Sequence, residues 1–290
     1  MKKKTLGFVS IFLFLFILTA FSKSRERFDI WENCDSFRQK KIRVFSDVYR
    51  PDADKSNRSA VIVCPGGSYF FPALKRESED VATLLTQRGF TVFVLKYRTA
   101  LGGYHHPAML QDLQRSIQLV RENSDAYGID SEKVGVMGFS AGGHLAGAGA
   151  ILYQENFLES LGIHPKVSLK PYFAVMVYPV VTMRPPYCHK KSCYSLLGKK
   201  PSEEMLQRMS LEENTHSGVP PLLILQARDD KTVDYRNSLL LAQALSEKNI
   251  PHRTILYGTG GHGFGGKPNP KVQMANWFED FMTWYKTNKF

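Results

Sequence analysis

The stretch GVMGFSAGGHLA, residues 135–146, decides the fold predicted for this chain. It contains GFSAG, of the form GxSxG, directly after the apolar run Val134–Met137 and at the start of the small-residue stretch Ala141–Ile151. A chance GxSxG occurs in roughly one in ten chains of this length, so the context carries the argument. Strand before and helix after predict a strained turn that presents Ser140, with glycine neighbours that let backbone segments pass closely. The alternative is a glycine-rich packing helix with an incidental serine.

Strands and helices alternate on both sides of this turn. The patterns predict strands at Ile42–Tyr49, Ala60–Cys64, Phe90–Tyr97, Val134–Met137, Phe173–Val181, Pro221–Ala227 and Arg253–Tyr257, and helices at Ser78–Arg88, Pro107–Asn123, Ala141–Ile151, Tyr235–Glu247 and Val272–Lys286. Such alternation predicts a mostly parallel sheet with helices on both faces, in a single α/β domain over residues 41–290. Residues 183–219 break the alternation, so we interpret them as an insertion that caps or rims the ligand site.

The N-terminus has the composition of a secretory leader. Three lysines at positions 2–4 precede the 16-residue apolar run Leu6–Phe21, which is shorter than the ~20 residues that span a bilayer. We expect a signal peptide at residues 1–22 with cleavage after Ser22, followed by an N-terminal arm at residues 23–40. The chain is then secreted or periplasmic, without stable membrane insertion. The alternative is a membrane anchor, because Lys23 and Arg25 place positive charge beyond the run.

Composition and charge exclude several classes. The 290 residues are 43% hydrophobic and 22% charged, as in ordinary globular proteins, which excludes disorder, collagen and coiled coil. The formal charge of +11 falls to +8 without the leader lysines and shows no dense basic run, so nucleic-acid binding is not expected. No Cys or His spacing resembles a metal site, and no cofactor is expected. Export permits a disulfide between Cys188 and Cys193, with unpaired thiols as the alternative.

Ser140 needs a base and an acid further along the chain. A serine hydroxyl is a weak nucleophile until a histidine held by a carboxylate removes its proton, in the chain order Ser, Asp, His. Asp229 and Asp230 follow the predicted strand Pro221–Ala227, and Asp230 fits a D-x-x-V spacing while Asp229 suits a turn. His262 lies in a glycine-rich loop after the last strand. We therefore predict Ser140, Asp230 and His262 as the triad, and we expect His144 to pack beneath the turn.

Acyl transfer also needs hydrogen-bond donors for an oxyanion. The backbone N–H of Ala141, directly after the serine, supplies one donor. The loop PGGSY at residues 65–69 follows an early strand, and its glycines permit the twist that turns N–H groups inward. Gly67 and Ser68 are the predicted donors of this loop, with an ordinary glycine turn as the alternative.

From residue 41 onward the chain resembles the α/β-hydrolase family, and within it secreted carbohydrate esterases of the acetyl xylan esterase type. The resemblance is carried by CPGGSY at 64–69, LKYR at 95–98, the segment from His106 to Asp130, GVMGFSAGGHLA at 135–146, DDKTV at 229–233 and GGHGFG at 260–265. Two departures are Ser68 in the glycine loop and Asp234, where proline is common. The resemblance implies hydrolysis of short acyl esters on sugars, with the triad named above.

The function expected is therefore that of a secreted serine esterase that removes short acyl groups, acetyl above all, from carbohydrates such as xylan through an acyl-enzyme. The insertion is basic and contains Tyr187 and Tyr194 near its lysine pairs, which suggests that it binds acidic glycans. The alternative is an ordinary solvated loop. A prolyl-oligopeptidase-like peptidase shares the fold and triad but usually has a large extra domain. A non-catalytic hydrolase-like binding protein would be marked by a broken triad.

Overall fold

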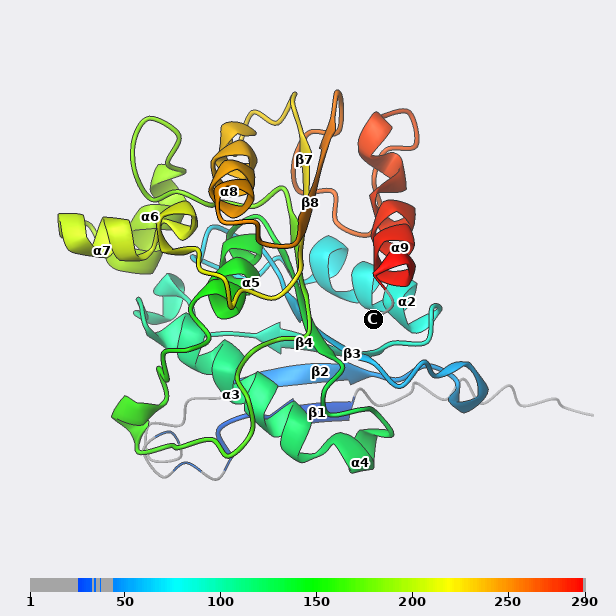
Figure 1. Cartoon of the computed structure of the whole chain (residues 1–290). Coiled ribbons are helices and arrows are strands. Elements are labelled where there is room, and N and C mark those ends of the chain that lie inside the picture. Colours follow the sequence, from blue (N-terminus) through cyan, green and yellow to red (C-terminus); the bar gives the residue numbers. More distant parts are fainter. Residues whose placement is uncertain (1–25, 33, 35–36, 38–43, 289–290) are drawn as a thin grey trace, which may run out of the picture.

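One twisted eight-stranded sheet organises the molecule (Figure 1). The computed structural model describes residues 26–32, 34, 37 and 44–288. The strands are β1 (Glu26–Asp29), β2 (Phe45–Tyr49), β3 (Ala60–Cys64), β4 (Thr91–Lys96), β5 (Val134–Phe139), β6 (Ala174–Val177), β7 (Leu222–Ala227) and β8 (His252–Tyr257). Their order is β1-β2-β4-β3-β5-β6-β7-β8, and all neighbours are parallel except β1 with β2 and β2 with β4. This confirms the predicted α/β class.

Helices cover both faces of the sheet (Figure 1). One face carries α3 (Ala108–Glu122), α5 (Ala141–Ile151) and α8 (Arg236–Glu247), and the other carries α2 (Asp80–Thr86) and α9 (Trp277–Thr287). Alternate residues of each central strand point to opposite faces, so Ile62 and Val136 join one core while Val63 and Met137 join the other. Because both faces are covered, β3, β5, β6 and β7 are buried along their whole length.

The register of the parallel strands places the predicted site segments together. Cys64 at the end of β3 pairs with Gly138 near the end of β5, so the PGGSY loop and the Ser140 turn leave the sheet side by side. β7 and β8 end beside each other as well, with Ala227 opposite Tyr257. The carboxyl ends of parallel strands meet at one edge of a sheet, where ligand sites of open α/β folds lie.

The structure adds a strand that the sequence analysis does not predict. β1 lies within the predicted N-terminal arm and pairs antiparallel with β2. Trp31 follows it, buried against Phe37, and its indole N–H donates to Asp112 at 2.8 Å. The described residues of the arm are thus part of the packed domain. The predicted leader at residues 1–22 lies outside the described residues. No helix in the part of the chain that the structure describes is long and apolar enough to cross a bilayer.

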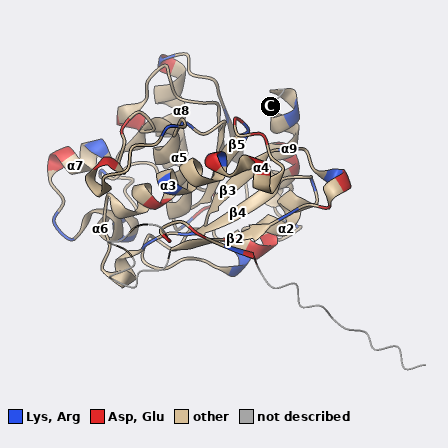
Figure 2. Cartoon of the chain, turned by 90° about the horizontal axis from the view of Figure 1, so that it is seen from below, with Lys and Arg blue, Asp and Glu red and all other residues tan. Residues whose placement is uncertain are grey.

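The predicted insertion contains two helices beside the sheet, α6 (Lys190–Leu197) and α7 (Glu203–Arg208). The start of α7 is capped by the Ser202 hydroxyl, which accepts the Met205 N–H. α6 is not predicted. It begins at the first lysine pair and buries Cys193 and Leu196. Basic and acidic residues are interspersed over the fold (Figure 2).

Candidate active site

Ser140 lies on the sharp turn between β5 and α5. Its φ of 55° and ψ of −119° are strained for a residue with a side chain. The neighbouring glycines are required by space, since a Cβ on Gly138 would lie 1.9 Å from the Gly142 carbonyl oxygen and one on Gly142 would lie 2.1 Å from that of Cys64. Packing on both sides therefore holds the turn, and the serine is aimed at the open end of the sheet.

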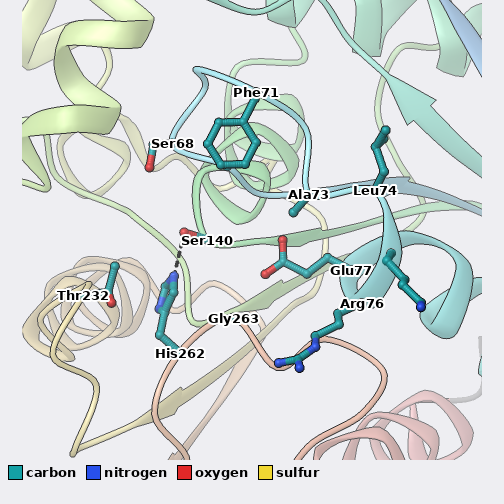
Figure 3. A pocket seen from close by; sticks show the side chains of 12 residues that line it. Ser68, Phe71, Ala73, Leu74, Arg76, Glu77, Ser140, Thr232, His262 and Gly263 are labelled. Carbon is teal, nitrogen blue, oxygen red and sulfur yellow. Dashed lines mark hydrogen bonds between the residues drawn. The ribbon is translucent and has the colours of Figure 1, made fainter.

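The structure brings the three predicted triad residues into one hydrogen-bonded chain. Ser140 Oγ lies 2.9 Å from His262 Nε2 (Figure 3). On the other side of the ring, His262 Nδ1 lies 2.7 Å from Asp230 Oδ2. The Asp230 carboxylate is fully buried, whereas the imidazole keeps 15% exposure. The side chains come from loops after β5, β7 and β8, which explains why residues far apart in sequence meet. The arrangement allows a proton to pass from the hydroxyl to the imidazole, with the carboxylate stabilising the resulting charge.

The two neighbouring aspartates have different partners. Asp230 Oδ1 accepts the backbone N–H groups of Thr232 and Val233, and its Oδ2 accepts from Gln226 as well as from His262. These donors fix the carboxylate toward the imidazole. Asp229 Oδ1 instead accepts the backbone N–H groups of Gly260 and Gly261, at 2.8 and 2.9 Å. It therefore anchors the loop that carries His262 without touching the ring.

The predicted oxyanion residues surround the same opening. Gly67, Ser68 and Tyr69 have successive positive φ angles of 115°, 57° and 58°. Consecutive left-handed residues can direct their N–H groups toward one point. Within the described residues, the N–H groups of Gly67, Ser68 and Ala141 have no protein acceptor. Gly67 and Ser68 line the cavity in front of Ser140, and Ala141 starts α5.

Buried side chains support this loop from below. The Tyr97 hydroxyl donates to the Pro65 carbonyl at 2.6 Å, and the Tyr69 hydroxyl lies 2.8 Å from His144 Nδ1. His144 Nε2 lies 2.8 Å from the Met209 carbonyl, so the ring donates there and accepts from Tyr69. Burial lowers the pKa of His144 to about 4, which keeps this ring neutral. The prediction that His144 packs beneath the turn is confirmed.

The cavity in front of Ser140 measures about 380 Å³ and opens to solvent. Its walls include Phe71, Leu74, Arg76, Glu77 and Thr232 (Figure 3). Three large hydrophobic side chains are exposed at its mouth. Phe70, Phe71 and Leu74 are 38%, 46% and 45% exposed. The Nζ of Lys191 in α6 lies 5.4 Å from the Phe70 ring and 5.6 Å from the Phe71 ring, so the insertion reaches this mouth.

The second lysine pair of the insertion lies elsewhere. Lys199 lines a separate cavity of about 280 Å³, together with Lys190, Cys188 and Cys193. Cys188 and Cys193 are free thiols, and the Cys193 thiol donates to the Met183 carbonyl. In the described part of the chain, no group of three or more His, Cys, Asp or Glu side chains could hold a metal ion.

Sequence reasoning missed Glu77 and Tyr178, both buried beside the triad. Tyr178 follows β6 with a φ of 38°, and its ring centroid lies 4.6 Å from that of His262. A polar side chain within the otherwise apolar run Phe173–Val181 was the available signal. Glu77 belongs to the π-helical turn Lys75–Glu79 before α2, which looks like a solvated helix start in the sequence.

Comparisons with known proteins agree with this architecture. Residues 46–245, well over half of the chain, match the sequence profile of the family described as BD-FAE. A solved structure of an acetyl ester-xyloside bifunctional hydrolase from Caldicellulosiruptor lactoaceticus is 31% identical, with a TM-score of 0.82, and the match covers 91% of this chain and 97% of that one. A carboxylesterase from Lactobacillus plantarum, 19% identical with a TM-score of 0.70 over 85% of this chain and 93% of that one, shares the fold.

Curated relatives are larger proteins. Endo-1,4-beta-xylanase B of Butyrivibrio fibrisolvens is 34% identical over 72% of this chain and 33% of its own length. An acetylxylan esterase of Xylanibacter ruminicola is 28% identical over 71% of this chain and 41% of its own length. The aligned part thus spans less than half of either relative. From the extent of the profile match and the fold, the chain belongs to the BD-FAE family of α/β hydrolases.

Proposed function

We propose that the protein is a serine esterase that releases short acyl groups, acetyl above all, from carbohydrates such as xylan. The observation that carries the proposal is the chain of hydrogen bonds from Ser140 through His262 to Asp230, at 2.9 and 2.7 Å, on the wall of an open cavity. A hydroxyl, imidazole and carboxylate in this order form the arrangement that activates serine for acyl transfer.

The first half of the proposed reaction acylates the serine. Ser140 Oγ attacks the ester carbonyl carbon while His262 Nε2 takes the hydroxyl proton. The carbonyl oxygen becomes an oxyanion, which the N–H groups of Ala141, Gly67 and Ser68 stabilise. Asp230 holds the Nδ1–H tautomer and stabilises the imidazolium. The imidazolium then gives its proton to the sugar oxygen as the C–O bond breaks, which leaves an acyl-serine.

The second half releases the acid. Water attacks the acyl carbon while His262 takes one of its protons, and the same N–H groups again stabilise the oxyanion. Collapse of this intermediate returns the proton to Ser140 Oγ and frees the carboxylic acid. Each proton is accounted for by the imidazole, so the residues of this chain suffice for the proposed cycle.

Two observations support a carbohydrate as the alcohol part of the substrate. Relatives matched along this chain include an acetylxylan esterase and an acetyl ester-xyloside bifunctional hydrolase. The cavity mouth carries the exposed rings of Phe70 and Phe71, and flat aromatic faces suit the apolar face of a sugar ring. We also propose that the protein is exported, because of the leader expected at residues 1–22. Polymeric glycans are accessible to an exported enzyme.

Substrate preference tests the proposal. The mature protein and Ser140→Ala are compared on nitrophenyl acetate, nitrophenyl butyrate and acetylated xylan, with acetate release as the readout for the polymer. We expect the mature protein to prefer acetate to butyrate and to release acetate from xylan, and Ser140→Ala to be inactive on all three. Preference for butyrate with no release from xylan would refute the carbohydrate substrate, and equal activity of Ser140→Ala would refute the serine mechanism.

A further inference from the structure

A second buried carboxylate, that of Glu77, lines the same cavity as Ser140 and His262. Its residue is only 4% exposed, yet the carboxylate lines the cavity and points toward Ser140 and His262 (Figure 3). It belongs to a π-helical turn, a rare local structure that often marks functional positions. Burial of a charge without hydrogen-bond partners costs free energy, so the contacts of the Glu77 carboxylate must offset that cost.

Both oxygens of Glu77 accept hydrogen bonds from segments that border the site. Oε2 accepts the backbone N–H of Gly66 at 2.7 Å, one residue before the predicted oxyanion donors. Oε1 accepts the hydroxyl of Tyr178 at 2.8 Å. Among the described residues, the carboxyl group meets two donors and no acceptor, which fits an ionised carboxylate.

Tyr178 passes this link on to the histidine loop. Its hydroxyl accepts the backbone N–H of Gly265 at 3.0 Å, and its ring packs against the imidazole of His262. The π-helical turn makes a second contact with the same loop, since the Arg76 carbonyl accepts the Gly266 N–H at 2.7 Å. Glu77 thus connects the π-helical turn that carries it to the oxyanion loop and to the histidine loop.

We propose that Glu77 is a positioning residue that fixes the oxyanion loop relative to His262 and whose negative charge favours the imidazolium formed during acyl transfer. The inference rests on the proposed esterase function. Glu77 does not touch the reacting atoms. It acts through Gly66 on the oxyanion donors and through Tyr178 on the histidine loop.

Several ionisable groups surround His262. Asp230 accepts its Nδ1–H, Glu77 and Tyr178 face it from the π-helical turn and from the end of β6, and His189 faces it from the insertion. Lys75 and Arg76 line the same cavity with opposite charge. Within this set, Glu77 and Asp230 are the carboxylates that favour a protonated ring, so removal of either negative charge makes protonation harder.

The test compares Glu77→Gln with Tyr178→Phe and with Glu79→Gln. Glutamine keeps the size of Glu77 but removes its charge and one of its two acceptors. We expect kcat on nitrophenyl acetate to fall on the order of 10- to 100-fold with KM nearly unchanged. We also expect the acid limb of the kcat/KM profile to move to lower pH, because a protonated imidazole would lose a favourable neighbouring charge.

The two other variants separate charge from packing. Tyr178→Phe keeps the carboxylate and the ring but loses the link, so kcat should fall with the acid limb in place. Glu79→Gln removes a carboxylate of the same turn that does not line the cavity, and should leave both quantities unchanged. Wild-type kcat in Glu77→Gln, or a loss of kcat with an unmoved acid limb, would overturn the proposal.

Folding failure and functional failure remain distinguishable. Thermal unfolding of each variant identifies a chain that does not fold. If Glu77→Gln does not fold, Tyr178→Phe decides: a lower kcat with an unchanged KM supports the link, and a wild-type kcat overturns it. If the wild-type protein itself hydrolyses no ester, the proposed function fails before the role of Glu77 is reached.

Discussion

Asp230 and Glu77 are two buried carboxylates beside one imidazole, and they are held in different ways. Asp230 accepts from two backbone N–H groups, an amide side chain and the imidazole itself. Glu77 accepts one backbone N–H and one tyrosine hydroxyl, and burial raises its pKa. Asp230 contacts the ring directly and fixes its tautomer. Glu77 contacts the bordering loops and fixes the distance between the oxyanion donors and His262.

The largest expected effect is on the Asp230 side. Asp230→Asn should lower kcat on nitrophenyl acetate by about 10⁴-fold, because an amide cannot hold the required tautomer and stabilise the imidazolium. Steady-state kinetics with a thermal unfolding control measure this. Asp229→Asn is the matched control, since an asparagine oxygen can still accept from Gly260 and Gly261. Equal losses in the two variants would contradict the assignment of the acid.

On the Glu77 side, Gly66→Ala should cost about 100- to 1000-fold in kcat, the range for loss of an oxyanion donor. A Cβ at this position would lie 2.6 Å from Glu77 Oε2 and 2.8 Å from the Phe139 carbonyl oxygen, so the loop must move. Gly128→Ala is the control for an added Cβ away from the site: nothing lies within 4 Å of its Cβ position, so its left-handed φ of 64° adds backbone strain without a clash. A Gly66→Ala protein with wild-type kcat would show that the oxyanion donors do not depend on this packing.

A smaller effect is expected where a carboxylate anchors only a loop. Asp229→Ala removes the acceptor of the Gly260 and Gly261 N–H groups and should lower kcat roughly tenfold, the equivalent of one hydrogen bond. Asp229→Asn should restore most of the rate. If Asp229→Ala were as damaging as Asp230→Asn, the distinction between holding the ring and holding the loop would fail.

The smallest effect is expected at the cavity mouth. Phe71→Ala should raise KM for acetylated xylo-oligosaccharides about fivefold, because a sugar ring loses a contact of about 1 kcal/mol. The kcat and KM for nitrophenyl acetate, which does not extend to the mouth, should stay unchanged. Leu239→Ala, another exposed apolar side chain, is the control. An unchanged KM for the oligosaccharide would exclude Phe71 from the glycan contact.

The sequence predicts the fold, and it leads to three side chains that the structure joins by hydrogen bonds, because both depend on local patterns. Val134–Met137 before GFSAG identifies the turn, and chain order leads to Asp230 and His262. β1 was missed because its four residues lie in a short polar stretch whose role appears only when β2 is in place. The start of α6 at a lysine pair also has no local helix signal, since its buried side chains Cys193 and Leu196 join the main hydrophobic core.

The supporting residues of the site depend on tertiary contacts that no spacing encodes. Glu77 and Tyr178 are 101 residues apart, and Tyr69 and His144 are 75 apart. Each pair is joined only because parallel strands end at one edge. Of the lysines that suggested a glycan grip, Lys191 reaches the cavity mouth, whereas Lys190 and Lys199 line another cavity. The sequence predicts that the insertion is basic, but it does not predict where the lysine side chains point.

Trapping of the acyl-enzyme tests the central claim most directly. The protein is mixed with nitrophenyl acetate, quenched in acid within the first turnover and digested, and its peptides are weighed by mass spectrometry. We predict one acetyl group on the peptide that carries Ser140, and none in Ser140→Ala. Ester hydrolysis by the wild-type protein with no acetyl group on Ser140, or with the acetyl group on another residue, would contradict it.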